Sequence, residues 1–149
     1  MRVDFYQLSQ DPAEIALAQI APKVLESGAR LLVVSESEDL RERIDRALWS
    51  ARSDSFVPHG RDSEPHAERQ PVLISDRLEP LNAPANGATC LALADGQWRE
   101  SETPFERVFF FFDADTLQHA REMWVAMRSR EGVEHNFWRQ ENGRWVKAA

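Results

Sequence analysis

Four consecutive phenylalanines, residues 109–112, close the apolar segment RVFFFF and constrain the fold of this chain more than any other feature. Successive side chains of a β-strand point to opposite faces of the sheet, so the run places aromatic rings on both faces. Aromatic residues also favour strands. We therefore expect a strand at residues 107–112 that is buried on both of its faces.

The rest of the chain alternates short apolar runs with longer segments of helical period, which is typical of a mainly parallel sheet covered by helices. The further expected strands span residues 3–8, 30–35, 71–74 and 89–94. Residues 30–35 (RLLVVS) are nearly all apolar, which predicts a central strand. A chain of 149 residues has the length of one ordinary domain, so we expect a single α/β domain over residues 1–149.

The first helix is expected to follow the first strand. Asp11 offers a capping residue, Pro12 suits the first helical position, and apolar residues at helical spacing continue as far as Ser27. Pro22 lies inside this segment. Because proline lacks the amide donor and clashes with the preceding turn, we predict a kink or a break there.

Two more helices are predicted by their caps and apolar stripes. Ser37 can cap the second helix, which ends near Trp49, and Asp113 or Asp115 can cap the last helix, which ends at Gly132. The second stripe consists of Leu40, Ile44, Ala47 and Leu48, and the last of Leu117, Ala120, Trp124 and Met127.

Two segments contain turn-forming residues. Residues 50–70 are polar and rich in Ser, Asp, Arg, His and Pro, which predicts a long surface connection. Near the end of the chain, Asn142-Gly143 separates two aromatic-rich arms. This pair favours a β-hairpin, which could add an edge to the sheet.

Charge and composition exclude several classes of protein. The net charge of −7 and the pI of 5.1 repel phosphate backbones, so we expect no direct contact with nucleic acid. Nowhere do eighteen consecutive apolar residues occur, and the amino terminus has no long apolar region, so we expect a soluble protein without a signal peptide or membrane contact. The one thiol, Cys90, adjoins an apolar run and is expected to be buried in a reducing, cytoplasmic protein.

No catalytic or cofactor motif stands out. A doubly wound sheet would suit a nucleotide, but no glycine-rich loop follows the first strand and the chain has only 6 glycines. Glu36, Glu38 and Asp39 could mimic a ribose-binding acid, although helix capping explains them equally. His59 and His66 share a loop without a thiolate partner, which makes zinc binding a poor interpretation. We expect no cofactor, no metal and no enzymatic activity.

The order of several short segments resembles the chi subunit of the bacterial DNA polymerase III holoenzyme. These segments are FYQL, ESGARLLVVSE, ALW, SFVPH, PVLI, FFFD and AREMW. The pair ALW and SFVPH, in this order and separation, is the most specific of them. The resemblance spans nearly the whole chain and implies a Rossmann-like, three-layer α/β sandwich without nucleotide chemistry. It further implies an accessory subunit of the clamp loader that pairs with the psi subunit and binds the carboxy-terminal tail of single-stranded DNA-binding protein (SSB).

The resemblance places the psi-subunit interface at and near five residues. These are Trp49, Phe56, Val57, Pro58 and His59. Large aromatic side chains can bury ~150–250 Å² each and often form binding hot spots. Such a role would explain why apolar residues stand in this polar stretch. From the residues alone, Trp49 and Phe56 could instead fold back onto the edge of the domain.

The same resemblance places the SSB-tail site on the last helix. Arg121, Val125 and Arg128 share one stripe, and Trp124 lies beside it. An acidic peptide that ends in a hydrophobic residue needs guanidinium groups and an apolar notch. Val125 stands where better-known members of the family carry lysine, so Arg128 or a loop substitutes for that donor, or binding is weaker. We expect roughly micromolar, salt-sensitive affinity.

The function implied by the resemblance is that of a non-catalytic bridge between the clamp loader and SSB, acting as a monomer or as a 1:1 heterodimer with psi. Two alternatives remain open. A nucleotide-dependent enzyme on the same sheet would be stabilised by ATP or NAD. A helicase-associated adaptor would use the same aromatic loop and compete with psi for it.

Overall fold

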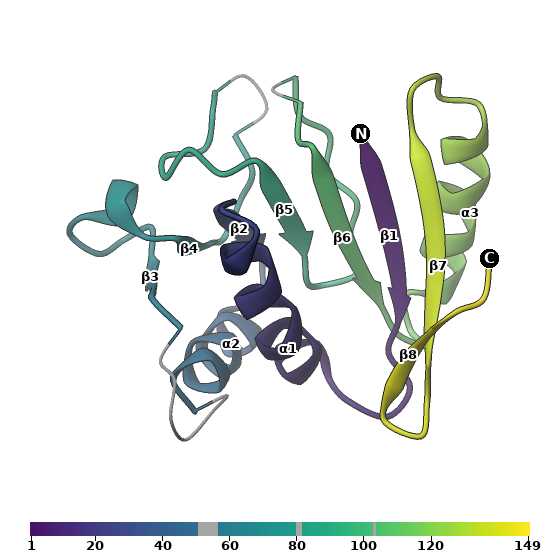
Figure 1. Cartoon of the computed structure of the whole chain (residues 1–149), viewed down its shortest axis with the longest axis horizontal. Coiled ribbons are helices and arrows are strands. Elements are labelled where there is room, and N and C mark those ends of the chain that lie inside the picture. Colours follow the sequence, from purple (N-terminus) through teal and green to yellow (C-terminus); the bar gives the residue numbers. More distant parts are fainter. Residues whose placement is uncertain (51–56, 80–81, 103) are drawn as a thin grey trace.

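Helices cover both faces of one large sheet, as the sequence predicted (Figure 1). The computed structural model describes residues 1–50, 57–79, 82–102 and 104–149. Within these ranges the strands are β1 (Arg2–Gln7), β2 (Leu31–Val34), β3 (His59–Arg61), β4 (Val72–Ser75), β5 (Cys90–Leu93), β6 (Arg107–Phe112), β7 (Glu134–Glu141) and β8 (Arg144–Lys147). The helices are α1 (Ala13–Glu26), α2 (Glu38–Ser50) and α3 (Leu117–Arg128), with a short 3-10 helix at Ala67–Arg69.

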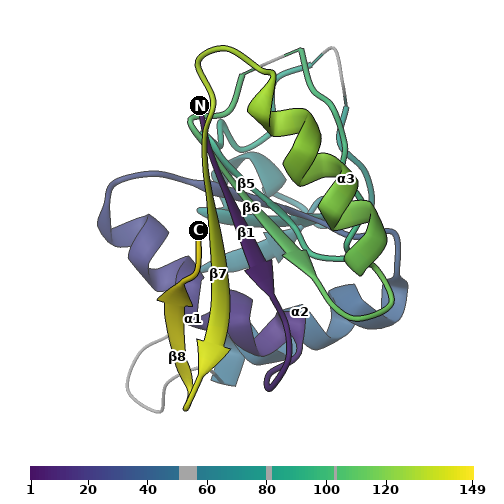
Figure 2. The ribbon, with the colours of Figure 1, turned by 90° about the vertical axis from the view of Figure 1, so that its right-hand side faces the viewer.

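The order of the strands is β3-β4-β2-β5-β6-β1-β7-β8, and all neighbours are parallel except the antiparallel pair of β7 and β8. Helices α1 and α2 pack on one face and α3 on the other, which Figure 2 shows along the sheet. The expected mostly parallel, three-layer α/β fold is confirmed.

The phenylalanine run lies inside the sheet and faces both helical layers. Phe109 and Phe111 belong to the core beneath α1 and α2, whereas Phe110 and Phe112 belong to the core beneath α3. All four rings are buried. The alternation of strand side chains therefore places one run of a single residue type in two separate cores.

Helix α2 begins as predicted, but the prediction for α1 is wrong in two respects. The Oγ atom of Ser37 accepts a hydrogen bond from the backbone amide of Leu40, 3.1 Å away, which caps α2. Helix α1 has Pro12 at its N-cap and no side-chain cap, because Asp11 instead accepts a hydrogen bond from Gln140. The helix also continues through Pro22 to Glu26, so of the predicted kink or break the break does not occur.

Helix α3 begins later and ends earlier than predicted. Its N-cap is Thr116, and the carboxylate of Asp113 accepts hydrogen bonds from the backbone amides of Asp115 and Thr116 in the preceding turn. Neither aspartate is therefore the cap itself. The helix ends at Arg128, and a turn leads from there to Gly132, whose φ of 75° favours glycine.

The polar segment 50–70 was predicted to be loop throughout, which is wrong for two short stretches. Strand β3 adds a parallel edge to β4, and the 3-10 helix follows it. Three residues that include glycine are too few to show a strand period in the sequence. Gly60 lies close to the side chain of Gln70, and a Cβ added to it would be 2.7 Å from Cγ of Gln70, which would have to move.

The predicted hairpin is confirmed. Asn142 and Gly143 have φ angles of 51° and 75°, which are the left-handed conformations that a two-residue hairpin turn requires. Strand β8 thereby adds the last strand beside β7, and Trp145 packs over Tyr6 with the ring centroids 5.0 Å apart.

A buried carboxylate joins three strands near the middle of the sheet. Asp4 on β1 has no exposed surface. Its oxygens accept hydrogen bonds from Arg107 Nε on β6 (2.8 Å), and from Asn136 Nδ2 (3.1 Å) and Trp138 Nε1 (3.0 Å) on β7. Arg2 lies 3.1 Å away on β1 itself. Both oxygens of the carboxylate thus have donors, as a buried charge requires.

The same carboxylate changes the chemistry of the neighbouring phenol. Burial and the negative charge of Asp4 raise the pKa of Tyr6 to about 12. Tyr6 is the one tyrosine of the chain. Its ring stacks on Phe111 and lies parallel to Trp138, so β1, β6 and β7 also share an aromatic row on this face.

We predict that Asp4→Ala lowers the free energy of unfolding by roughly 3 kcal/mol, because it leaves two guanidinium groups and two N–H donors without their acceptor. Urea unfolding followed by tryptophan fluorescence measures this loss. The matched control is Asp115→Ala, at an exposed position whose side chain accepts no hydrogen bond from a described residue. Equal stabilities of the two variants would contradict the role given to Asp4.

Candidate interaction sites

The residues predicted to bind an SSB tail lie together on α3. Val125 is 60% exposed, Arg121 and Arg128 are exposed, and Trp124 is partly buried. Within the described part of the chain, neither arginine forms an ion pair. Both guanidinium groups are therefore available to a ligand.

A pocket of about 500 Å³ separates α3 from the sheet next to these residues. Arg121, Trp124 and Val125 line it, whereas Arg128 does not. The remaining lining residues are Phe5, Gln7, Phe112, Leu117, Ala120, Phe137 and Ala149. The pocket is thus an apolar notch with a guanidinium group at its edge.

Three phenylalanines that the sequence did not assign to this site form much of the notch. Phe5, Phe112 and Phe137 come from β1, β6 and β7, which are neighbours in the sheet. Their strands could be predicted from sequence, but not their order, so nothing in the sequence indicated that they would meet. Trp124 lies edge-to-face against Phe5 and Phe137, at centroid distances of 5.2 Å and 6.0 Å, which fixes its ring at the pocket wall.

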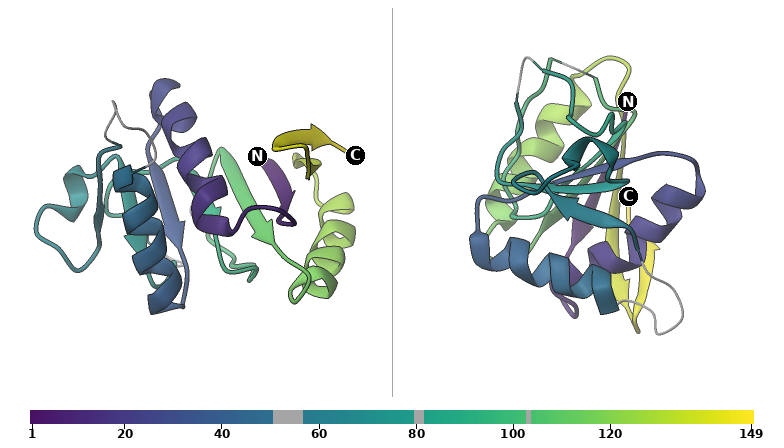
Figure 3. Two further views of the ribbon diagram at one scale, coloured as in Figure 1. Left: turned by 90° about the horizontal axis from the view of Figure 1, so that it is seen from below. Right: turned by 90° about the vertical axis from the view of Figure 1, so that its left-hand side faces the viewer.

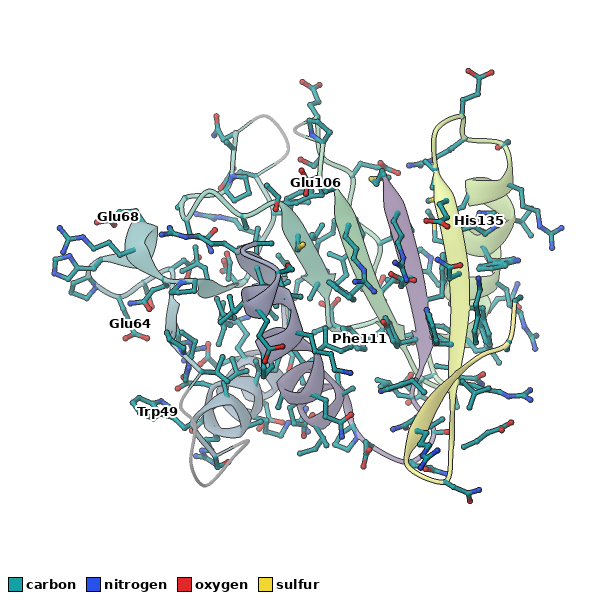
Figure 4. All side chains as sticks on the ribbon, viewed as in Figure 1. Trp49, Glu64, Glu68, Glu106, Phe111 and His135 are labelled. Atoms are coloured by element: carbon teal, nitrogen blue, oxygen red, sulfur yellow. The ribbon has the colours of Figure 1, made fainter. Side chains whose placement is uncertain are left out.

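The residues predicted to bind psi divide into exposed and buried members. Trp49, at the end of α2, is 61% exposed and projects away from the domain in Figure 4. Pro58 is also exposed. Val57 is 4% exposed and belongs to the core beneath α1 and α2, and the side chain of His59 is buried. Phe56 lies outside the described residues.

His59 supports the exposed tryptophan from below. Its ring lies edge-on to Trp49, with the centroids 5.4 Å apart. The Nδ1 atom is 2.6 Å from the carbonyl oxygen of Val57, and Nε2 is 2.6 Å from Oδ1 of Asp45 on α2. These contacts tie the segment of Val57 and His59 to α2, and through the His59 ring to Trp49.

The pocket at the carboxyl ends of the strands has the wrong charge for a nucleotide. It has a volume of about 530 Å³ and lies where doubly wound sheets bind ligands. Its ionisable lining residues are Asp11, Glu14, Arg43, Asp95 and Asp113. Four carboxylates and one guanidinium group disfavour phosphate, and no glycine-rich turn is present in its lining.

The other residues considered for ligand chemistry have structural partners. Hydrogen bonds from Arg61 and Arg41 hold the pKa of Glu38 below its usual range, so this acid is engaged within the chain. Cys90 is buried, as predicted, and burial raises the pKa of its thiol. Among the described residues, no cluster of three or more His, Cys, Asp or Glu side chains could hold a metal ion.

Comparison with known proteins supports the resemblance. A family model described as "DNA polymerase III chi subunit, HolC" matches residues 1–135. The chain belongs to this family. It is therefore a member of a family of accessory subunits of a replicative DNA polymerase.

Two curated relatives of this family are similar over most of their lengths. The probable DNA polymerase III subunit chi of Rickettsia prowazekii (strain Madrid E) is 24% identical over 155 aligned residues, which cover 97% of this chain and 90% of that protein. DNA polymerase III subunit chi of Escherichia coli (strain K12) is 29% identical over 133 residues, covering 83% and 88%.

A solved structure with a weaker likeness is the C-terminal domain of the Sulfolobus solfataricus SWI2/SNF2 ATPase. The alignment has a TM-score of 0.48 and 15% identity, and it covers 78% of this chain and 57% of that one. This likeness carries no argument about function.

Among the described helices, none is long and apolar enough to cross a membrane.

We predict that Val57→Ala lowers the free energy of unfolding by roughly 2 kcal/mol, because it removes buried methyl groups from the core beneath α1 and α2. Thermal and urea unfolding measure the change. Val125→Ala is the matched control at an exposed helical site, and we expect it to alter stability by less than about 0.5 kcal/mol. A Val57→Ala protein as stable as the control would mean that Val57 is surface, as the sequence had suggested.

Proposed function

We propose that this chain is a non-catalytic, cytoplasmic bridge that holds the psi subunit of the polymerase III holoenzyme on one surface and the carboxy-terminal tail of SSB on another. Membership of the chi family supports this role. The single observation that carries it is the pocket beneath α3, which combines an apolar notch with an unpaired guanidinium group. A protein tail that ends in a hydrophobic residue and a carboxylate has the complementary chemistry.

The proposed tail contacts divide between the notch and its edge. The last hydrophobic side chain of the tail enters the notch between Trp124 and Phe137, and its carboxylate pairs with Arg121. Val125 lies at the rim and adds apolar contact where a lysine would add charge. Arg128, further along the helix and outside the pocket lining, pairs with acidic residues that precede the end of the tail.

We predict that a labelled SSB-tail peptide binds with ~micromolar dissociation constant and that salt weakens this binding. Arg121→Ala removes the proposed charge-assisted hydrogen bond to the carboxylate of the tail. Because Arg121 is exposed and solvent screens its charge, we expect about tenfold weaker binding. Fluorescence anisotropy measures both. Arg69→Ala, at an exposed arginine on the 3-10 helix, is the control and leaves binding unchanged.

Two results would overturn the assignment of the tail site. One is equal loss of binding in Arg121→Ala and Arg69→Ala, which would indicate a general charge effect. The other is undiminished binding of a peptide without its final residue, since that residue is proposed to fill the notch. Val125→Lys adds a positive test, because a restored donor at the rim should strengthen binding several-fold.

The proposed psi surface centres on Trp49. The exposed indole and Pro58 offer the contact, and the buried His59, hydrogen-bonded to the partly exposed Asp45, holds the indole in place. Exposed tryptophans supported in this way are frequent hot spots of protein interfaces. A helicase-associated adaptor would use the same surface, so the choice of psi rests on the family.

We predict that Trp49→Ala weakens binding of the psi subunit from the same organism by about thirtyfold or more, as truncation of a hot-spot residue does. Isothermal titration calorimetry with the purified subunits measures the change. Val125→Ala serves as the control and binds psi normally, while Trp49→Ala binds the SSB-tail peptide normally. A psi affinity unaffected by Trp49→Ala would place the interface elsewhere.

A further inference from the structure

Among the described strands, β8 ends the sheet, and none lies on its outer edge. In the described residues it pairs with β7 alone, at the end of the strand order. In an antiparallel pair, alternate residues direct their backbone N–H and C=O groups away from the partner strand. The outer edge of β8 therefore offers backbone donors and acceptors to another extended chain.

A groove runs between this edge and α1. Figures 2 and 3 show β8 and α1 on the same side of the sheet. Between them lies a cavity of about 640 Å³, whose lining includes Ile15, Lys23, Arg144 and Trp145. A second cavity of about 610 Å³ shares Lys23 and Trp145 with it. The two cavities therefore adjoin each other, and together they are here called the α1–β8 groove.

The groove is basic in a protein that is acidic overall. Lys23 and Arg144 are exposed and, within the described chain, form no ion pair. None of the described residues that line the first cavity is acidic, and Glu106 is the one acid that lines the second. Since the whole chain carries a net charge of −7, this local excess of cations selects an acidic ligand.

Two apolar side chains give the groove anchoring points. Ile15 on α1 is 40% exposed and lies at helical spacing from the exposed Gln19 and Lys23, which line the same cavity. Trp145 on β8 is partly buried and lines both cavities.

We propose that an extended, acidic segment of a partner protein adds to the outer edge of β8 and lies in the α1–β8 groove. Its backbone pairs with β8, its alternate apolar side chains contact Ile15 and Trp145, and its carboxylates pair with Lys23 and Arg144. This site lies on the face opposite to the α3 pocket. It is therefore independent of the proposed SSB-tail site.

The test is a selection of random peptides displayed on phage against the full chain. A parallel selection uses the double variant Lys23→Glu/Arg144→Glu as its target. This variant reverses two exposed charges and leaves the core intact. We expect peptides specific to the unaltered chain in which acidic and apolar residues alternate. Synthetic copies of these peptides should bind the double variant about tenfold more weakly or worse.

Backbone pairing is tested with the strongest of these peptides. N-methylation of its alternate amides should weaken binding, and amide NMR shifts in the labelled protein should map to β8 and α1. The proposal is overturned if the selected peptides bind the double variant equally well, if no peptide distinguishes the two proteins, or if the shifts map to α3. Competition by an oligothymidine of about 16 nucleotides would assign the groove to single-stranded nucleic acid and overturn it as well.

Discussion

The buried carboxylate of Asp4 is the interaction on which the functional half of the molecule depends. It holds β1, β6 and β7 in register from one side of the sheet, through Arg107 and Asn136. On the other side, the same three strands present the phenylalanines beneath α3. A charge buried without these donors would be costly, so the hydrogen bonds fix which strands are neighbours. Because β6, β1 and β7 are neighbours, Phe112, Phe5 and Phe137 meet and line the pocket beneath α3.

The layered fold keeps the proposed contacts apart. Trp49 lies at the end of α2 on one face, and the pocket with Arg121 lies beneath α3 on the other, at opposite sides of the view in Figure 4. A bridge needs this arrangement, because two partners that share one surface compete. Each weak contact is then strengthened by the other through a raised local concentration. The sheet between them needs no motion to perform this role.

The sequence predicted elements well and their contacts poorly. Local signals were sufficient for the phenylalanine strand, for the Ser37 cap and for the Asn142-Gly143 hairpin, since each depends on neighbouring residues. The strand β3 was missed because three residues show no period. Of the kink or break predicted at Pro22, the break does not occur, because the packing of α1 on the core outweighs one lost hydrogen bond.

The candidate sites likewise could be predicted where they depend on local spacing and not where they depend on tertiary packing. Arg121, Trp124 and Val125 could be grouped by helical spacing, and the structure places them on one pocket. Arg128 shares their stripe but lies outside the lining. Val57 was assigned to surface because it lies in a polar segment, yet the edge strand that follows it draws it into the core.

The most direct test of the bridge is sedimentation velocity of psi, this chain and a labelled SSB-tail peptide together. We expect the peptide to sediment with the psi complex and to keep its affinity for this chain when psi is saturating. Displacement of the peptide by psi would contradict it.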